Sequence, residues 1–192
     1  MNKLIIDNNK FKGLILKICR DVSNSGWRPD YIVGITRGGL IPAVMISHYL
    51  GVPMKSLDVS LRDGGDCVSN CGMAEDALGY PKQERSVADK TDTAGVSLLK
   101  ERDTFKNILV VDDINDTGAT FNWIMQDWPN LCLPNDEDWK WVWNNNVRFA
   151  VVVDNLSSKC NVKIDYSGME VNKAENDVWI DFPWEIFWTT PY

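Results

Sequence analysis

Short apolar runs alternate with segments of helical periodicity in the first part of the chain. Apolar side chains from Leu14 to Trp27 recur at the spacing of an amphipathic helix, and Tyr31 to Ile35 is a continuous apolar run typical of a short strand. The apolar segment from Leu40 to Leu50 is followed by a glycine and predicts a second helix. Weak alternation from Met54 to Leu61 predicts another strand.

The same order of strand and helix returns in the second half. Asn107 to Val111 is an apolar run that ends at two carboxylates, as expected for a buried parallel strand, and Gly118 to Trp128 has the pattern of a helix. Val147 to Val153 predicts a strong strand, and Val162 to Tyr166 predicts a hairpin or an edge strand. The aromatic segment from Asp177 to Glu185 follows.

Alternating strands and helices predict the α/β fold class, with a central, mainly parallel sheet flanked by helices. A chain of 192 residues fits one domain, so we expect a single domain over residues 1–192. Arg62 to Phe105 is rich in Gly, Asp, Ser and charge and has no persistent period. A loop of this length is either a functional lid or disordered, and both interpretations stay open.

Composition excludes several function classes. The net charge of -7 argues against binding nucleic acid, which needs a basic face, and the chain has no apolar run long enough to cross a membrane. Five scattered cysteines and the absence of a secretory signal pattern indicate a cytoplasmic protein. The single histidine, His48, lies in an apolar helical segment, where packing or surface exposure is the simpler explanation.

The run from Ile108 to Thr120 joins a buried strand to a helix start through a turn of small, hydrogen-bonding residues. Backbone N–H groups at such a turn can converge on a phosphate. Asp112 and Asp113 cannot favour a phosphate, but carboxylates accept hydrogen bonds from sugar hydroxyls and ligate Mg²⁺. An Asp-rich turn can also simply cap a helix. The whole run favours a ribose-phosphate site over that alternative.

A second candidate loop, Thr36-Arg37-Gly38-Gly39, lies between the early strand and the helix that follows it. Its glycines let backbone amides face an anion, and Arg37 supplies a forked cation. An Arg-Gly-Gly turn alone is weak support for a site, because such turns occur in many loops.

Together these segments resemble the type I phosphoribosyltransferase family. Its signature for 5-phosphoribosyl-1-pyrophosphate (PRPP) is an apolar strand, two acidic residues, two variable residues and Asp-Thr-Gly-x-Thr, and the chain meets every position. The resemblance implies that the paired acids contact the ribose, that Asp116 is the catalytic acid/base near the acceptor, and that Mg²⁺ is the cofactor. The implied PRPP-binding residues are Thr36, Arg37, Gly38, Asp112, Asp113, Asp116, Thr117, Gly118, Ala119 and Thr120.

The segment from Asp177 to Glu185 resembles the end of bacterial xanthine-guanine phosphoribosyltransferases. The resemblance implies that Trp179 stacks on the base, that the Ile180 backbone reads its edge, and that Asp181, with Asp113, approaches the metal. This segment is expected to form most of a small hood. Less specifically, Met73 to Tyr80 resembles phosphoribosyltransferase-like proteins of bacteriophages.

The chain departs from the purine enzymes after its strong strand, where they carry a lysine that donates to the exocyclic oxygen of the base. Asp154 and Asn155 stand there instead. Asn155 can donate and accept, so it is a candidate base contact, whereas Asp154 would repel an oxygen acceptor. This departure puts selectivity for 6-oxopurines in doubt.

The resemblance implies transfer of a phosphoribosyl group from PRPP to a purine-like base in purine salvage, and a homo-oligomer. Two alternatives keep the site: a non-catalytic PRPP or nucleotide sensor, and a phosphoribosyltransferase for a non-purine acceptor. A third treats the tryptophan-rich segment from Trp128 to Trp143 as an interaction surface. Packing or a subunit interface is the expected role of Trp139, Trp141, Trp143 and Trp188.

Overall fold

A five-stranded, fully parallel sheet forms the centre of the computed structural model, which describes residues 2–61, 67–79 and 105–185. Its strand order is β3-β2-β4-β5-β6. The bounds of these strands are β2 (Tyr31–Ile35), β3 (Met54–Leu57), β4 (Ile108–Asn115), β5 (Val147–Asn155) and β6 (Tyr166–Val171).

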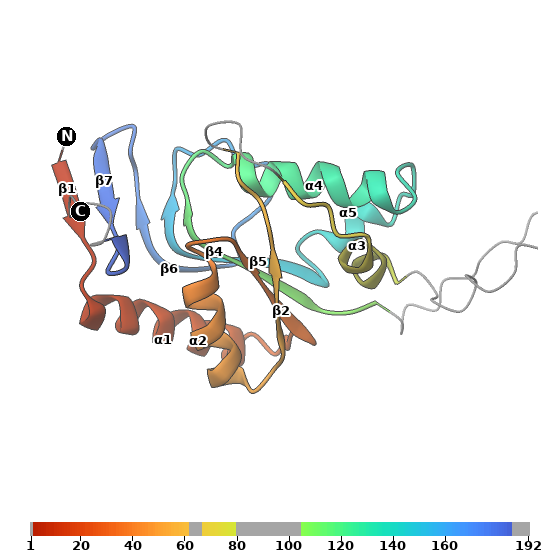
Figure 1. The fold of residues 1–192 in the computed structure, drawn as a ribbon, viewed down its shortest axis with the longest axis horizontal. Coiled ribbons are helices and arrows are strands. Elements are labelled where there is room, and N and C mark those ends of the chain that lie inside the picture. Colours follow the sequence, from red (N-terminus) through yellow and green to blue (C-terminus); the bar gives the residue numbers. More distant parts are fainter. Residues whose placement is uncertain (1, 62–66, 80–104, 186–192) are drawn as a thin grey trace, which may run out of the picture.

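Helices cover both faces of this sheet (Figure 1). α1 (Asn8–Asn24) and α2 (Leu40–Leu50) pack on one face, and α3 (Cys71–Leu78), α4 (Ala119–Leu131) and α5 (Trp139–Val142) pack on the other. Within the described ranges, no helix is both long and apolar enough to cross a membrane. The predicted α/β fold class is confirmed.

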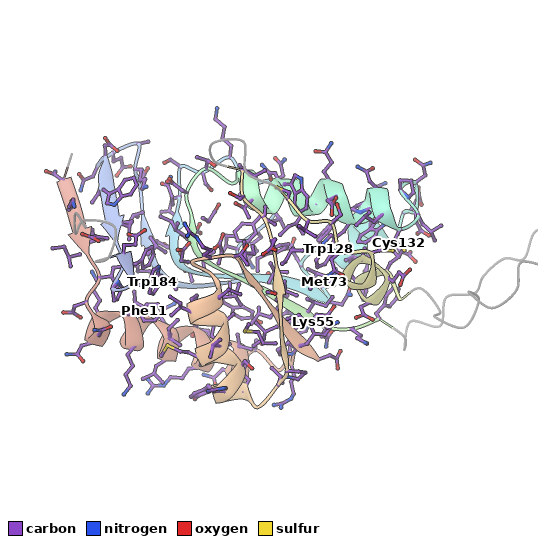
Figure 2. The ribbon with its side chains drawn as sticks, viewed as in Figure 1. Phe11, Lys55, Met73, Trp128, Cys132 and Trp184 are labelled. Atoms are coloured by element: carbon purple, nitrogen blue, oxygen red, sulfur yellow. The ribbon has the colours of Figure 1, made fainter. Side chains whose placement is uncertain are left out.

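The first four residues of β4 are all apolar because helices cover both faces of this strand. Ile108 and Val110 belong to the core under α3, α4 and α5, whereas Leu109 and Val111 belong to the core under α1 and α2. Because successive strand residues point to opposite faces, a strand covered on both sides needs apolar residues at every position. Figure 2 shows the two cores through their labelled members: Met73, Trp128 and Cys132 in the first, Phe11 and Trp184 in the second.

The tryptophan-rich segment contributes to the first core. Trp128 and Trp139 are buried, and the rings of Trp139 and Trp143 stack with centroids 5.5 Å apart. This supports the packing role predicted for Trp139 and Trp143. Trp141 is more exposed and lies beside Phe105, with ring centroids 5.3 Å apart. Trp188 lies outside the described residues.

A second, two-stranded sheet pairs β1 (Asn2–Ile5) in parallel with β7 (Val178–Asp181). The two strands come from opposite ends of the sequence and lie side by side in Figure 1. Phe11 of α1 packs edge-on against Trp184, with ring centroids 5.0 Å apart, and so ties this sheet to the main core. This sheet combines the amino-terminal strand, which was not predicted, with the carboxyl-terminal segment that was expected to form most of a hood.

Several predicted boundaries need correction. α3 lies within the segment predicted to be a loop: Asn70 caps its first turn and Gly79 ends it in the left-handed conformation. The rest of that predicted loop, residues 62–66 and 80–104, lies outside the described residues. The strand after β5 is β6, which pairs in parallel with β5 and is an edge strand of the main sheet, as one of the two alternatives predicted, but it begins at Tyr166, where the predicted segment ends. A helix as short as α3 has too few turns to show a clear period.

The strand order places a topological switch point between β2 and β4. From β2 the chain moves outward to β3, and it then returns to the other side of β2 to form β4. Connections after β2 and β4 therefore leave the sheet in opposite directions, which opens a crevice at the carboxyl ends of these strands. Both candidate loops of the sequence follow these two strands.

Truncation of Phe149 tests the packing of the first core. Phe149 is fully buried and its ring packs edge-on against Phe121, with centroids 5.2 Å apart. We expect Phe149→Ala to lower the free energy of unfolding by about 3–5 kcal/mol, because it leaves a cavity among large rings. Urea denaturation measures this loss. The control Leu156→Ala truncates a side chain that is 58% exposed and should change stability by less than about 0.5 kcal/mol.

Candidate functional site at the carboxyl edge of the sheet

The loop after β2 lies directly against the end of β4. A Cβ atom on Gly39 would lie 2.6 Å from the Val111 carbonyl oxygen and 2.8 Å from that of Ile35, and one on Gly38 would overlap the Asp113 carboxylate. Only glycine allows backbones to approach this closely. The two loops that the sequence analysis predicted as separate halves of a site are thus in contact. The peptide bond between Thr36 and Arg37 is cis.

The two carboxylates continue β4 rather than ending it, because the strand runs on to Asn115. Asp112 is buried, and its Oδ1 accepts a hydrogen bond from the Asp113 backbone N–H at 2.9 Å. Asp113 is half-buried and faces Gly38. The strand therefore presents a pair of acidic side chains beside the glycine loop.

Two helices begin at this crevice with glycine N-caps. α2 starts after Gly39 and α4 starts after Gly118, and neither has a side-chain cap. By contrast, Asp7 caps α1 and Asn70 caps α3 through side-chain hydrogen bonds. A helix N-terminus whose N-cap residue is glycine carries the positive end of the helix dipole without an N-cap side chain, which suits an anion.

Turn residues Asp116, Thr117 and Gly118 are held in place by the loop after β5. Gly118 has a φ of +85° and packs against the Cys160 backbone. Any other residue at this position would have a strained backbone, and its Cβ atom would overlap the Cys160 backbone. Lys159 N–H donates to the Thr117 carbonyl oxygen at 3.0 Å. Thr117 Oγ1 accepts weakly from the Ala119 N–H at 3.3 Å. Ala119 and Thr120 form the first turn of α4.

Asn155, a predicted base contact, has its amide committed within the protein. It is buried, and its Nδ2 donates to the Asp116 carbonyl oxygen at 2.8 Å. Its Oδ1 accepts from Ser157 Oγ at 2.8 Å and from the Lys173 N–H at 3.0 Å. This placement argues against a direct contact between Asn155 and the base, because its oxygen has no remaining capacity and its nitrogen already supports the Asp116 loop.

The sequence analysis missed Lys173. This residue follows β6, and its Nζ forms an ion pair with Asp116 Oδ1 at 2.8 Å. Both side chains are largely shielded, with exposed fractions of 18% for Lys173 and 30% for Asp116. No motif or spacing could have found the pair, because its members are 57 positions apart in the sequence and the parallel pairing of β5 with β6 brings them together.

Residues 3–185 match the family model described as the phosphoribosyl transferase domain. The chain belongs to the phosphoribosyltransferase family. It is 24% identical over 169 residues to the hypoxanthine-guanine phosphoribosyltransferase of Schizosaccharomyces pombe, covering 83% of this chain and 78% of that enzyme. It is 26% identical over 164 residues to the xanthine-guanine phosphoribosyltransferase of Cereibacter sphaeroides, covering 85% and 72%.

The fold is shared with a solved structure of the same family. The purine phosphoribosyltransferase of Pyrococcus horikoshii superposes with a TM-score of 0.60 at 23% identity, covering 100% of this chain and 98% of that one. The predicted family, its type I fold and the enzyme class are thereby confirmed.

Strand β7 of this phosphoribosyltransferase carries three residues predicted near the base and the metal. Trp179 is 39% exposed on β7, whereas Ile180 is buried in the core under α1 and α2. Asp181 pairs with Lys3 across the small sheet, at an Oδ2 to Nζ distance of 3.7 Å. The exposed indole leaves Trp179 available for stacking, and Ile180 offers only its backbone.

No group of three or more metal-ligating side chains occurs in the part of the chain that the structure describes. Proteins usually hold Mg²⁺ through one or two carboxylates, with substrate phosphates and water completing its shell. Asp112 and Asp113 are adjacent carboxylates of the right chemistry.

Asp154, near the carboxyl end of β5, has a partly buried carboxyl group. Burial raises the pKa of Asp154, the hydrogen bond from Asn115 opposes this shift, and the charge of Glu170 adds to it. Asn115 Nδ2 donates to Asp154 Oδ1 at 2.8 Å and so links β4 to β5. Because the folded chain holds the Asp154 proton more tightly than the unfolded chain, stability falls as pH rises through the interval between the two pKa values.

Replacing Asp154 by asparagine tests whether burial of the Asp154 carboxylate lowers the stability of the folded chain. We expect Asp154→Asn to raise the unfolding midpoint relative to wild type at about pH 7, and the difference to shrink as the pH falls and the wild-type carboxyl becomes protonated. The new amide oxygen can still accept from Asn115. Thermal melts at successive pH values measure the effect, with the exposed Asp177→Asn as control. A difference that does not change with pH would contradict the explanation.

Proposed function

We propose that this phosphoribosyltransferase transfers the 5-phosphoribosyl group of PRPP to a purine-like base, releasing pyrophosphate and forming a nucleoside monophosphate. The observation that carries the proposal is the contact between the Gly38-Gly39 loop and the carboxylates of β4 at the switch point. It brings groups suited to an anion beside groups suited to sugar hydroxyls. A phosphorylated sugar needs both.

Each part of PRPP has a proposed partner at this edge. The 5′-phosphate lies in the turn of Asp116, Thr117, Gly118, Ala119 and Thr120, where hydroxyls and the amides of the first turn of α4 converge. The ribose hydroxyls donate to the adjacent carboxylates within β4. The pyrophosphate lies at the loop after β2. Asp112 and Asp113 are the residues proposed to contact the ribose. Thr36, Arg37 and Gly38 are the residues proposed to contact the pyrophosphate.

In the proposed reaction, a ring nitrogen of the base forms a bond to C1′ while the bond between C1′ and the pyrophosphate oxygen breaks. The electron pair of the broken bond leaves with pyrophosphate. Asp116 accepts the proton that the base gives up. Arg37 offsets charge on the leaving group, and the fixed loops hold the reactants in line, which is expected to lower the barrier more than proton transfer does.

Mg²⁺, which type I phosphoribosyltransferases generally use with PRPP, would supply further neutralisation of the pyrophosphate charge. Asp113 is the proposed protein ligand, because it faces the loop that would hold pyrophosphate. Asp181 remains the second proposed ligand, and it would have to exchange its ion pair with Lys3 for the metal.

The proposed acceptor is a purine. The named relatives act on hypoxanthine, guanine or xanthine, and the exposed indole of Trp179 offers a surface on which a flat base can stack. The Ile180 backbone is the proposed edge contact. On this basis the chain has a role in purine salvage.

Pyrophosphate release tests the proposal. The protein is incubated with Mg²⁺ and PRPP against guanine, xanthine, hypoxanthine, adenine and uracil. We expect release with at least one purine, and Asp116→Asn should lower kcat about a hundred- to ten-thousandfold because it removes the proton acceptor. The control Asp177→Asn should leave the rate unchanged. PRPP-dependent thermal stabilisation without release from any base would support the sensor instead.

The glycine loop allows a separate test of PRPP binding. We expect Gly39→Ala to abolish most of the thermal stabilisation by PRPP, because its Cβ would press on the carbonyl oxygens of Ile35 and Val111 and push the loop off β4. Gly13→Ala, at a helical position with no atom near the new Cβ, is the matched control. Unchanged PRPP binding by Gly39→Ala would place the pyrophosphate elsewhere.

A further inference from the structure

The loop after β5 lies against the turn proposed to hold the 5′-phosphate. Its Cys160 backbone is so close to Gly118 that a Cβ atom added to the glycine would overlap the Cys160 nitrogen and lie 2.6 Å from its Cα. Lys159 N–H also donates to the Thr117 carbonyl oxygen at 3.0 Å. The turn is therefore supported from behind by the backbone of a different strand connection.

A single side chain of α4 brackets this contact. Asn122 Nδ2 donates to the Lys159 carbonyl oxygen at 2.8 Å, and Asn122 Oδ1 accepts from the Asn161 N–H at 2.8 Å. These backbone groups belong to the residues directly before and after Cys160. The Asn122 amide thus holds the short segment around Cys160 at both of its ends.

The backbone of Asn122 holds the other side of the same contact. Its N–H donates to the Gly118 carbonyl oxygen at 3.0 Å, in the first turn of α4. Phe121, the preceding residue, is buried in the first core, so packing sets the position of this helical turn. Asn122 consequently connects the loop after β5 to the packed start of α4.

Two further contacts anchor the loop on either side of this segment. Ser158 Oγ accepts from Asn115 Nδ2 at 2.9 Å, and Val162 is buried in the first core. The residues between these anchors are the ones that Asn122 holds against Gly118. Because the anchors restrict the loop already, two hydrogen bonds from one amide are enough to select a single position for its middle part.

We propose that Asn122 is a positioning residue for PRPP, which holds residues 159–161 against Gly118 and so keeps the N–H groups of the turn directed at the 5′-phosphate. The inference rests on the proposed function, since it assumes that this phosphate lies in the turn from Asp116 to Thr120. Asn122 acts through the Cys160 backbone and Gly118 rather than by touching the phosphate. A turn whose amides are already fixed loses less conformational entropy when an anion binds.

Asp116, at the start of the same turn, has a support of its own. Asn155 Nδ2 donates to the Asp116 carbonyl oxygen at 2.8 Å, and the Asp116 carboxylate pairs with Lys173. Loss of the Asn122 contacts therefore leaves the proposed proton acceptor in place. Asn122 should accordingly affect the binding of the phosphate far more than the chemical step.

The test compares Asn122→Ala with the wild-type protein. Alanine removes both side-chain hydrogen bonds and is the best helix former, so this half-buried position of α4 should stay helical. Asn107→Ala is the matched control. The Asn107 side chain is also half-buried and also joins two segments, through a 2.9 Å hydrogen bond to the Arg28 carbonyl oxygen, but it lies at the amino edge of the sheet.

The two halves of the site are measured separately. Calorimetric titration with ribose 5-phosphate reports on the phosphate turn, and titration with Mg²⁺ and inorganic pyrophosphate reports on the loop after β2. Steady-state kinetics give the KM for PRPP and kcat, and thermal melts without ligand give the stability of each variant.

We expect Asn122→Ala to weaken ribose 5-phosphate binding and to raise the KM for PRPP about tenfold, because the two hydrogen bonds that hold the turn are lost. Pyrophosphate binding and kcat should stay within about threefold of wild type, because neither depends on the Asn122 contacts. Asn107→Ala should match the wild type in every measurement with a ligand.

Two results would overturn the inference. In the first, Asn122→Ala lowers the thermal midpoint but binds ribose 5-phosphate as the wild type does, which would leave Asn122 a purely structural contact. In the second, binding of ribose 5-phosphate and of pyrophosphate weakens equally, which would indicate a general disturbance of the site. A wild-type protein that binds ribose 5-phosphate without turnover would refute the proposed reaction alone, since selectively weaker binding by Asn122→Ala would still support the inference. A wild-type protein that binds no ribose 5-phosphate would overturn both proposals.

Discussion

The close approach of Gly39 to the backbones of Ile35 and Val111 is the constraint on which the candidate site depends. A single added carbon would lie 2.6 Å from one carbonyl oxygen and 2.8 Å from another, so the loop after β2 and the end of β4 can meet only where a side chain is missing. This contact places the pyrophosphate loop against Asp113. The same contact also places the amino terminus of α2 at the crevice where α4 begins.

The remaining half of the site depends on hydrogen bonds between loops at the carboxyl edge. Asn115, the last residue of β4, donates to Asp154 of β5 and to Ser158 of the loop after β5, and Asn155 joins the Asp116 backbone to the turn after β6. Both side chains are buried, where water competes weakly for the hydrogen bonds that their amide nitrogens donate, so these bonds hold the loops in one arrangement. The Asp116 carboxylate and the Lys173 ammonium are positioned by this arrangement rather than by their own flexible side chains.

Local sequence was a good guide wherever a single segment carried the information. The bounds of β2 and α2 were predicted as observed, because a continuous apolar run and a terminal glycine are local signals. β4 was predicted to end before its carboxylates but continues to Asn115, because strand pairing with β5 persists there regardless of side-chain polarity. β1 went unpredicted, since a four-residue strand gains its stability only from its partner at the other end of the sequence.

The sequence by itself determined the family, the parallel α/β architecture and the two loops that face each other, because each rests on residues adjacent in the chain. Tertiary structure alone decided which polar residues reach the site. Asn155 lies next to the predicted base position in sequence, yet its amide is used within the protein. Lys173 lies far from any motif, yet it meets Asp116 at 2.8 Å. Such pairings depend on strand order and register, which bring remote residues together and leave no periodic or compositional trace in the chain.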